Sequence, residues 1–468
     1  DRSWAISQNI IISGRDIVGN DLTNPTTYAL MDAYFDMNLP QPILSVKLHK
    51  NTPAKLYEEM GRFLFSPGVL TPSFFNDDSL YAVLSAHGVA AEDLPDISIA
   101  GCQEPLVMGK DNGNTTNSWL NLPKILEMTL TGGVSTVTGE KLVDVEACPL
   151  ENIREGFYKN VQRFVDEMAK AANGASRAIS TQRVPFLSCL MGGLENGIDA
   201  RDIHKQGTKY NGSGCLIHGV SVIADSFAAI DKLLAERPQD SDKLVDALKA
   251  NFKGYEELRE FLLSADKFGN NIEKVDSEAA EIASKVADIV AGEKNYLGNP
   301  FRPDFSSPST HLLYGYWVGA TPDGRSSRDM LGYGVDPLYG SAENGLGFRM
   351  LSNMKLPFDK MNGGYASPLG IDPKNFKAPP YEGIEFRDKV IAPLFFNSLM
   401  EGVSPFYLYV NVTTAEILRK VLADPKKYAP SGVYIMRIHG TFVNFLDLSP
   451  AIQQDIITRL DPGSTALC

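Results

Sequence analysis

The sequence predicts an α/β protein. Segments with the apolar period of helices alternate along the whole chain with short extended runs, which is the pattern of α/β folds. Hydrophobic residues make up 43% of the 468 residues and charged residues 22%, as in ordinary globular proteins. Glycine and proline are dense between residues 293 and 350, but aromatic and aliphatic side chains are threaded through them. We therefore expect packed loops there rather than a linker.

The elements of the first part of the chain follow from start signals and periodicity. Asn24-Pro25 and Thr52-Pro53 are typical of helix starts, and residues 41–48 alternate apolar with polar side chains as strands do. Gly132-Gly133 ends another helical pattern. The predicted elements are an extended run over 4–12, helices over 24–36, 52–65, 78–88 and 121–131, and strands over 41–48 and 97–102.

Longer amphipathic patterns follow in the middle of the chain, and shorter elements return at its end. The apolar positions of residues 150–172 recur at helical spacing, as do those of 272–291. The predicted helices are 150–172, 217–235, 241–264, 272–291, 385–400, 414–423 and 450–460, with strands over 406–412 and 433–438. Core packing is the simplest reading of these apolar stripes.

Composition and charge exclude several classes of function. The chain has 44 basic and 57 acidic residues, a net charge of -13 that repels phosphate backbones, so we expect no nucleic acid partner. No apolar run is long enough for a membrane helix, so no membrane partner is expected. The five cysteines never have C-x-x-C spacing. That argues against a disulfide framework and against a metal site, and favours a reducing, cytoplasmic setting.

The segment around Cys102 and Glu104 is the first candidate for chemistry. In an extended segment these two side chains point the same way, while Gly101 permits a sharp turn. A neighbouring carboxylate disfavours a thiolate, so the pair suits a cysteine that exchanges a hydrogen atom while Glu104 moves protons. An inert cysteine beside a turn carboxylate explains the pair equally simply. A hydrolase that uses Cys102 as nucleophile is disfavoured, because no histidine is close in sequence.

The second candidate is Gly440, which follows Arg437 at the end of a predicted strand. A glycine at a strand-end turn needs no further explanation. However, a glycine Cα has no side chain, so it can become planar and share an unpaired electron with the flanking amide groups. Gly440 is therefore also a candidate for a backbone radical.

Together with other motifs, these two segments resemble the C-terminal part of the glycyl radical enzymes. The resemblance covers essentially the whole chain, and its order and spacing are specific. It is carried by residues 101–105, 207–211, 224–230 and 320–325, by Asn411, Val412, Tyr428, Arg437 and Gly440, and by residues 446–450 and 453–459. The family's fold is an α/β barrel of two half-sheets surrounded by helices, with the cysteine and glycine loops meeting inside.

The resemblance also implies a mechanism and partners. A radical-SAM activating enzyme removes a hydrogen atom from Gly440, and the radical passes to Cys102, whose thiyl takes a hydrogen atom from a small-molecule substrate. No bound cofactor or metal is implied beyond the protein radical. Such enzymes are oxygen-sensitive, anaerobic and commonly oligomeric. The implied division is a catalytic part with the cysteine loop over 1–425 and a glycyl radical segment over 426–468.

The residues that follow the cysteine indicate the branch of the family. Gln103 stands where the formate-lyase branch has a second cysteine, and Cys-x-Glu resembles the dehydratases, C–X lyases and decarboxylases. In that branch the glutamate transfers protons, a role that falls here to Glu104. The resemblance thus implies a lyase for a small polar oxygenated substrate. A C–C bond-forming enzyme, an acyltransferase and a non-catalytic scaffold subunit remain alternatives.

Three features depart from the family pattern. Only about a hundred residues precede Cys102, whereas the family has a long N-terminal half, so a second chain or a further part of this one is expected to complete the barrel. His439 and Thr441 differ from the usual glycine loop. Residues 109–119 form an amide- and hydroxyl-rich loop in place of Gly-Trp-His-Asp, and are expected either to bind a polar substrate or to form simple turns.

Overall fold

The computed structural model describes residues 8–39, 41–65, 70–307, 310–371, 382–397, 402–438 and 441–460. These residues fold into two compact units. Unit 1 comprises Asp1–Met108, Glu343–Met350 and Gly364–Cys468, and unit 2 comprises Gly109–Ala342 and Leu351–Gly363. Unit 1 therefore combines the two ends of the chain, whereas unit 2 is built from its middle. Both units contain sheets and helices, which confirms the predicted α/β class.

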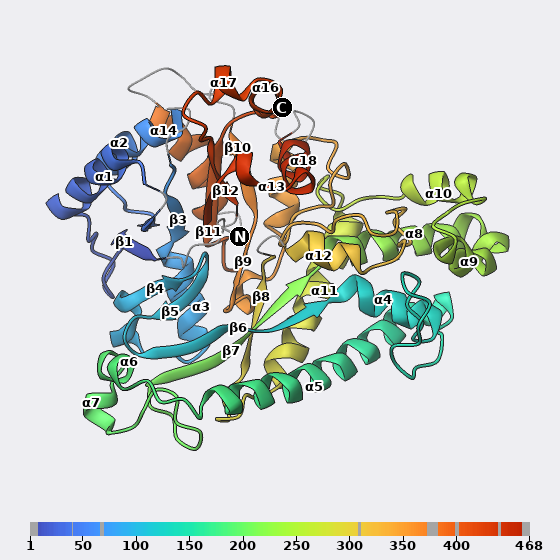
Figure 1. The fold of residues 1–468 in the computed structure, drawn as a ribbon, viewed down its shortest axis with the longest axis horizontal. Helices are drawn as coiled ribbons and strands as arrows, with labels where there is room; N and C mark the ends of the chain where they lie inside the picture. The colour runs from blue at the N-terminus through green and yellow to red at the C-terminus, as the bar shows by residue number, and fades with distance from the viewer. Residues whose placement is uncertain are drawn as a thin grey trace. The chain divides into compact units, whose positions relative to one another are not determined.

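A five-stranded sheet forms the centre of unit 1. Its first three strands are parallel, the third pairs antiparallel with a strand from the far end of the chain, and that strand pairs in parallel with the last. Figure 1 shows the blue N-terminal strand β3 near the red-brown β11. The order is β1 (Asn9–Ser13), β2 (Ile43–Leu48), β3 (Ser73–Asn76), β11 (Tyr407–Val412) and β10 (Pro368–Ile371).

Most helices of unit 1 begin within two residues of the predicted start. The helix predicted over 385–400 instead begins at Glu382 and is interrupted by a π-helical turn, and the helix Pro425–Tyr428 was not predicted. The Asn24 side chain accepts the backbone N–H groups of Thr26 and Thr27, which caps the first helix. Asn76 and Thr414 cap two others in the same way. The helices are α1 (Pro25–Met37), α2 (Ala54–Phe65), α3 (Asp77–Ala86), α14 (Glu382–Phe386), α15 (Ala392–Phe395), α16 (Ala415–Ala423), α17 (Pro425–Tyr428) and α18 (Pro450–Arg459), with a π-helical turn over Arg387–Ile391.

Two antiparallel hairpins complete unit 1, beside the two-residue strand β9 (Gly364–Tyr365). One joins β4 (Ile97–Ala100) to β5 (Glu104–Val107), and the other joins β12 (Ile435–Ile438) to β13 (Thr441–Asn444). Apolar residues of the second hairpin and of α16 and α18 share one buried cluster. The predicted boundary at residue 426 stays a prediction.

Unit 2 contains three parallel strands that pair in sequence order. They are β6 (Asp111–Asn121), β7 (Tyr210–His218) and β8 (Phe301–Phe305). The long helix α5 runs along β6 and β7 in Figure 1. The helices are α4 (Leu122–Thr131), α5 (Ile153–Ile179), α6 (Pro185–Leu190), α7 (Gly193–Asn196), α8 (Val220–Glu236), α9 (Leu244–Lys249), α10 (Glu256–Leu263), α11 (Glu273–Gly292) and α12 (Thr310–Tyr316). A further helix, α13 (Leu346–Asn353), has residues in both units.

The structure corrects the prediction of a polar loop after Gly109. Residues from Asp111 onward form strand β6, because their polar groups find partners on neighbouring strands. The Ser118 hydroxyl donates to the Gly214 carbonyl at 3.0 Å, and Arg302 pairs with Asp111 at 2.9 Å. The strand bulges between Asn114 and Ser118, a feature that local sequence alternation does not reveal.

The continuous helix predicted over 241–264 is also wrong. The chain forms α9 and α10 with a break between them, where Asn251 and Phe252 adopt φ values of 49° and 60° and Gly254 one of 83°. Such left-handed backbone cannot continue a right-handed helix. Strands β7 and β8 were not predicted, because the glycines of β7 and the glycine- and proline-rich surroundings of β8 hide the strand pattern.

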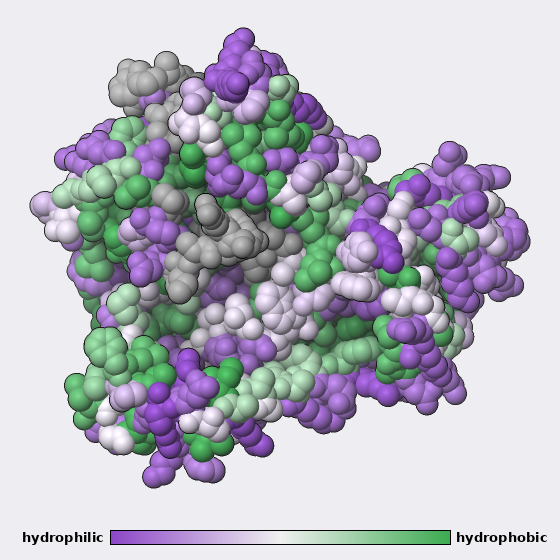
Figure 2. All heavy atoms as spheres, in the orientation of Figure 1, coloured by the Kyte–Doolittle hydropathy of each residue, from purple (hydrophilic) through white to green (hydrophobic). Residues whose placement is uncertain are grey.

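The surface is mixed, with one apolar corner. In Figure 2 the region of α6 and α7 is largely green. It exposes Phe186, Leu190 and Leu194, which are 82%, 62% and 77% accessible. Within the described ranges, no helix has the length and apolar character that crossing a membrane requires.

Candidate active site

The cysteine segment is a tight turn rather than the extended run that the sequence predicts. Residues 101–103 connect β4 to β5, with Ala100 opposite Glu104 in the hairpin register. Gly101 has a φ of 54°, and a Cβ there would lie 2.8 Å from a Glu104 carboxylate oxygen. Glycine is thus required at this position both by the backbone and by the carboxylate beneath the turn.

Glu104 is buried under the turn that carries the partly exposed Cys102. Its Oε2 accepts the backbone N–H groups of Cys102 at 3.0 Å and of Gln103 at 3.1 Å. Burial raises the pKa of Glu104 above its ordinary value, and these N–H groups oppose the rise. The predicted proximity of Cys102 and Glu104 is therefore present, although it arises from a turn. A carboxyl with a raised pKa is suited to proton transfer.

The turn is fastened to one face of the five-stranded sheet. The Asn9 side chain on β1 donates to the carbonyls of Gly101 at 2.8 Å and Ile99 at 3.3 Å, and accepts from Ser45 on β2 at 3.0 Å. Lys47 on β2 donates to the Ile97 carbonyl at 3.3 Å. Strand β4 and the cysteine turn therefore lie over the sheet face that carries Asn9, Ser45 and Lys47.

The strand register extends this face to the far end of the chain. Ser45 pairs with Ser73 and Lys47 with Phe75, while Ser73 pairs in turn with Tyr409 and Phe75 with Tyr407. Paired residues in a sheet point to the same side. Tyr407 and Tyr409 of β11 therefore share the face over which the cysteine turn is fastened.

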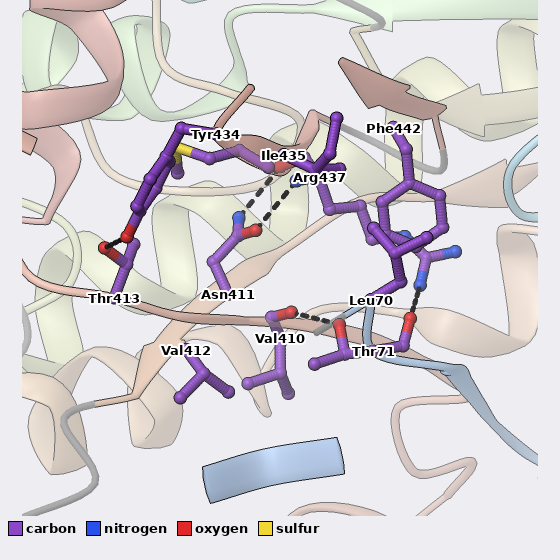
Figure 3. A pocket seen from close by; sticks show the side chains of 11 residues that line it. Leu70, Thr71, Val410, Asn411, Val412, Thr413, Tyr434, Ile435, Arg437 and Phe442 are labelled. Atoms are coloured by element: carbon purple, nitrogen blue, oxygen red, sulfur yellow. Dashed lines mark hydrogen bonds between the residues drawn. The ribbon is translucent and has the colours of Figure 1, made fainter. Parts of the chain in front are cut away.

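Strand β12, which precedes Gly440, is held against the same sheet (Figure 3). The Asn411 side chain bonds both the N–H and the carbonyl of Arg437, at 2.9 and 2.8 Å. The Arg437 guanidinium is buried, donating to the Thr71 carbonyl at 2.8 Å and to the Ser73 hydroxyl. It also lies 4.9 Å from the Phe442 ring centroid. A small crevice of about 20 Å³ is lined by these groups.

Tyr407 is close enough to both segments to respond to their charges. The pKa of its phenol lies well above the ordinary value, first because it is buried and further because of negative charge on Cys102 and Glu104, while Arg437 opposes the rise. The hydrogen bonds of Asn9 and of Arg437 show that the cysteine turn and strand β12 both lie against this face of the sheet in unit 1. Gly440 and His439 themselves lie outside the described residues.

Sequence reasoning missed Asn9 and Tyr407 as site residues. Nothing in the local sequence distinguishes Asn9, because its role depends on a turn about ninety residues away. Tyr407, Tyr409 and Asn411 alternate along a predicted strand, and that period of two was a signal that they share one face.

A second polar region lies within unit 2. The expected polar stretch lines a cavity of about 290 Å³ with Asn112, Asn114 and Thr116, opposite Arg201 and Tyr296. Its role in substrate binding stays a prediction. Over the residues that the structure covers, no group of three or more His, Cys, Asp or Glu side chains gathers in a way that holds a metal ion.

Known proteins share the fold of this chain. A family model described as "Pyruvate formate lyase-like" matches residues 2–315, well over half of the chain. The fold aligns with a glycyl radical enzyme from Archaeoglobus fulgidus at a TM-score of 0.88 and 26% identity, over 98% of this chain and 58% of that one. It aligns with a B12-independent glycerol dehydratase from Clostridium butyricum at 0.87 and 28%, over 97% and 57%.

Among curated proteins, a trans-4-hydroxy-L-proline dehydratase of Clostridioides difficile is 26% identical, over 97% of this chain and 56% of the relative. An isethionate sulfite-lyase of Bilophila wadsworthia is 25% identical, over 98% and 55%. The fold is that of a glycyl radical enzyme, which confirms the resemblance inferred from the motifs. The chain belongs to the pyruvate formate lyase-like family, and it spans little more than half the length of the curated relatives it matches.

Proposed function

We propose that this chain carries the catalytic cysteine and the radical glycine of a glycyl radical lyase for a small polar oxygenated substrate. Gly440 stores the radical, Cys102 exchanges hydrogen atoms with the substrate, and Glu104 transfers a proton. One observation carries the proposal. The turn with Cys102 and Glu104 and the strand that leads to Gly440 approach the same face of one sheet, although more than 300 residues separate them in sequence.

The proposed reaction balances without a bound cofactor. The Gly440 radical takes a hydrogen atom from the Cys102 thiol, and the resulting thiyl takes one from a substrate C–H bond. Glu104 accepts the proton of a hydroxyl on that carbon, and the neighbouring leaving group departs with its electron pair. The product radical then takes the hydrogen atom back from Cys102, and the thiyl returns the radical to Gly440. Burial raises the pKa of Glu104, which makes its carboxylate a stronger base for the hydroxyl proton, and the protonated carboxyl then passes that proton to the departing group or to solvent.

Relatives support this class of substrate. They include the dehydratases of trans-4-hydroxy-L-proline and of (2S)-3-sulfopropanediol, and the sulfite-lyase of isethionate. All three names describe removal of a group from a small polar molecule. A formate acetyltransferase of Haemophilus influenzae is also 25% identical, but Gln103 follows Cys102 here and disfavours the acyltransferase alternative.

We propose three further features of the working enzyme. A radical-SAM activating enzyme installs the radical on Gly440, so the enzyme works anaerobically. The length missing relative to the relatives is supplied by a second chain or by a further part of this one, and the whole is oligomeric. The acidic composition supports a cytoplasmic setting, and so do the four cysteines in the described part of the chain, all of which are free thiols.

Anaerobic activation followed by electron paramagnetic resonance tests the proposal. The complete protein, with any partner chain that copurifies, is treated with a radical-SAM activating enzyme. We expect a doublet signal, which the Gly440→Ala variant lacks. In D₂O the doublet should collapse, because Cys102 returns deuterium to Gly440, and Cys102→Ser should keep the doublet. A panel of hydroxyproline, isethionate, sulfopropanediol, glycerol and propane-1,2-diol then tests turnover. A wild type with no doublet, or with no conversion of any panel member, contradicts the proposal.

A further inference from the structure

Tyr407 carries a polar group that the proposed mechanism does not use. The residue is 1% exposed, and its hydroxyl has no hydrogen-bond partner among the described residues. Leaving a buried hydroxyl without a partner is costly. Such a hydroxyl is available to bind a ligand where its ring lies near reactive groups.

The surrounding contacts hold the Tyr407 ring in place without engaging its hydroxyl. The ring stacks on Phe75 at a centroid distance of 5.0 Å. The Tyr365 hydroxyl donates to the Tyr407 carbonyl at 2.8 Å and accepts the Tyr407 N–H at 3.0 Å. Both bonds are made by one hydroxyl, which fixes the backbone of β11 at Tyr407. The ring is thus preorganised, as a ligand-binding group must be.

The segment that contains Tyr365 also contacts the cysteine turn. Gly364, next to Tyr365, approaches the turn so closely that an added Cβ would lie 3.1 Å from the Gln103 carbonyl oxygen. The cysteine turn is also fastened over the sheet face to which Tyr407 belongs. Two independent sets of contacts therefore hold the cysteine turn over the part of the sheet that carries Tyr407.

We propose that the Tyr407 hydroxyl donates a hydrogen bond to an oxygen of the substrate held between Cys102 and Glu104, and so fixes which C–H bond Cys102 reaches. The inference rests on the proposed function and deepens it, because it requires a substrate with an oxygen atom beside the reacting carbon. A neutral phenol in this place is a donor and not a base, since its environment keeps the proton on the oxygen.

Tyr407→Phe tests the inference, because it removes only the hydroxyl. We expect the activated variant to keep the wild-type doublet and its collapse in D₂O, since neither needs substrate. Its kcat/KM on the panel member that the wild type converts should fall about 10- to 100-fold, the effect of one lost hydrogen bond. Its Tm should stay unchanged or rise, because the variant removes a buried hydroxyl that bonds none of the residues the structure describes.

Tyr158→Phe is the matched control. Its hydroxyl is likewise buried without a partner among the described residues, but it lies on α5 in unit 2. We expect unchanged kcat/KM for this control. Wild-type kcat/KM in Tyr407→Phe overturns the inference and leaves the proposed function intact, and so does a Tm several degrees below wild type, which indicates a structural role. A wild type without doublet or turnover overturns the proposed function and this inference with it.

Discussion

Glu104 in unit 1 and Asp225 in unit 2 are both buried carboxyls whose pKa is raised by burial, yet their surroundings differ. Asp225 lies within helix α8 and accepts the Phe268 N–H at 2.7 Å, a contact that joins two packed segments of one unit. Glu104 lies under a turn beside a partly exposed cysteine, on a sheet face that two distant parts of the chain also approach. A raised pKa alone therefore does not distinguish a catalytic carboxyl from a structural one. What distinguishes Glu104 is that separate segments of the chain converge on the reactive group beside it.

Glu127, another buried carboxylate of unit 2, has a structural role like that of Asp225. It accepts from Lys124 at 3.0 Å, from the Thr136 N–H at 2.6 Å and from the Gly319 N–H at 3.0 Å. Arg325 behaves similarly, because its guanidinium donates to the carbonyls of Gly319 and Gly315. Both residues hold loops together within unit 2.

The largest expected effect is that of Cys102→Ser in unit 1. A serine hydroxyl holds its hydrogen atom too strongly to pass it to Gly440, so turnover should fall by about 10⁴-fold or more, as for other residues that react directly. The doublet signal should persist. Turnover and spin are measured on the same activated sample. Unchanged turnover would show that the chain is a scaffold.

Glu104→Gln should have the next largest effect, a loss of about 10²- to 10⁴-fold in kcat/KM. If Glu104 is the base, wild-type kcat/KM rises with pH through its raised pKa, and the variant lacks that rise. The stability of the fold changes with pH in the opposite direction to kcat/KM. A carboxyl with a raised pKa in the fold loses stability as pH rises, so the variant should be the more stable above that pKa. Equal turnover in wild type and variant would favour C–C bond formation instead.

Asn411→Ala tests how strand β12 is held in unit 1. The variant loses both hydrogen bonds to the Arg437 backbone, which should cost about 1–3 kcal/mol of stability. The expected fall in Tm is about 2–4 °C per kcal/mol, with a lower spin yield on Gly440. Calorimetry and spin counting measure these two quantities. A normal spin yield together with a lowered Tm would show that the hydrogen bonds of Asn411 to Arg437 stabilise the fold but are not needed to store the radical on Gly440.

Asp225→Asn should have the smallest effect on turnover, namely none. Burial raises the pKa of Asp225 to about 8, whereas the unfolded value is about 3.9. The fold therefore binds the proton more tightly, and between those pH values wild-type stability falls as pH rises, by about 1.4 kcal/mol per pH unit. The variant should lack this slope and melt higher at pH 8. Loss of turnover at unchanged stability would place Asp225 in the site.

The sequence by itself determined the α/β class, most helices of unit 1 and the family, because these depend on local periodicity, on capping residues such as Asn24 and on short motifs. It also selected Cys102, Glu104 and Gly440 as candidates. It did not reveal strand β6, in which Ser118 bonds the backbone of β7 and Asp111 pairs with Arg302 of β8.

Only the tertiary structure decided which other residues belong to the candidate site. Asn9, Tyr407 and Arg437 come from separate parts of the chain, and strand register places the first two on one face of the sheet, where Arg437 joins them through Ser73. Strand pairing between distant segments has no local sequence signal, since the partners meet only after the chain has folded. For the same reason, only the folded structure shows that the Tyr407 hydroxyl lacks a hydrogen-bond partner among the described residues.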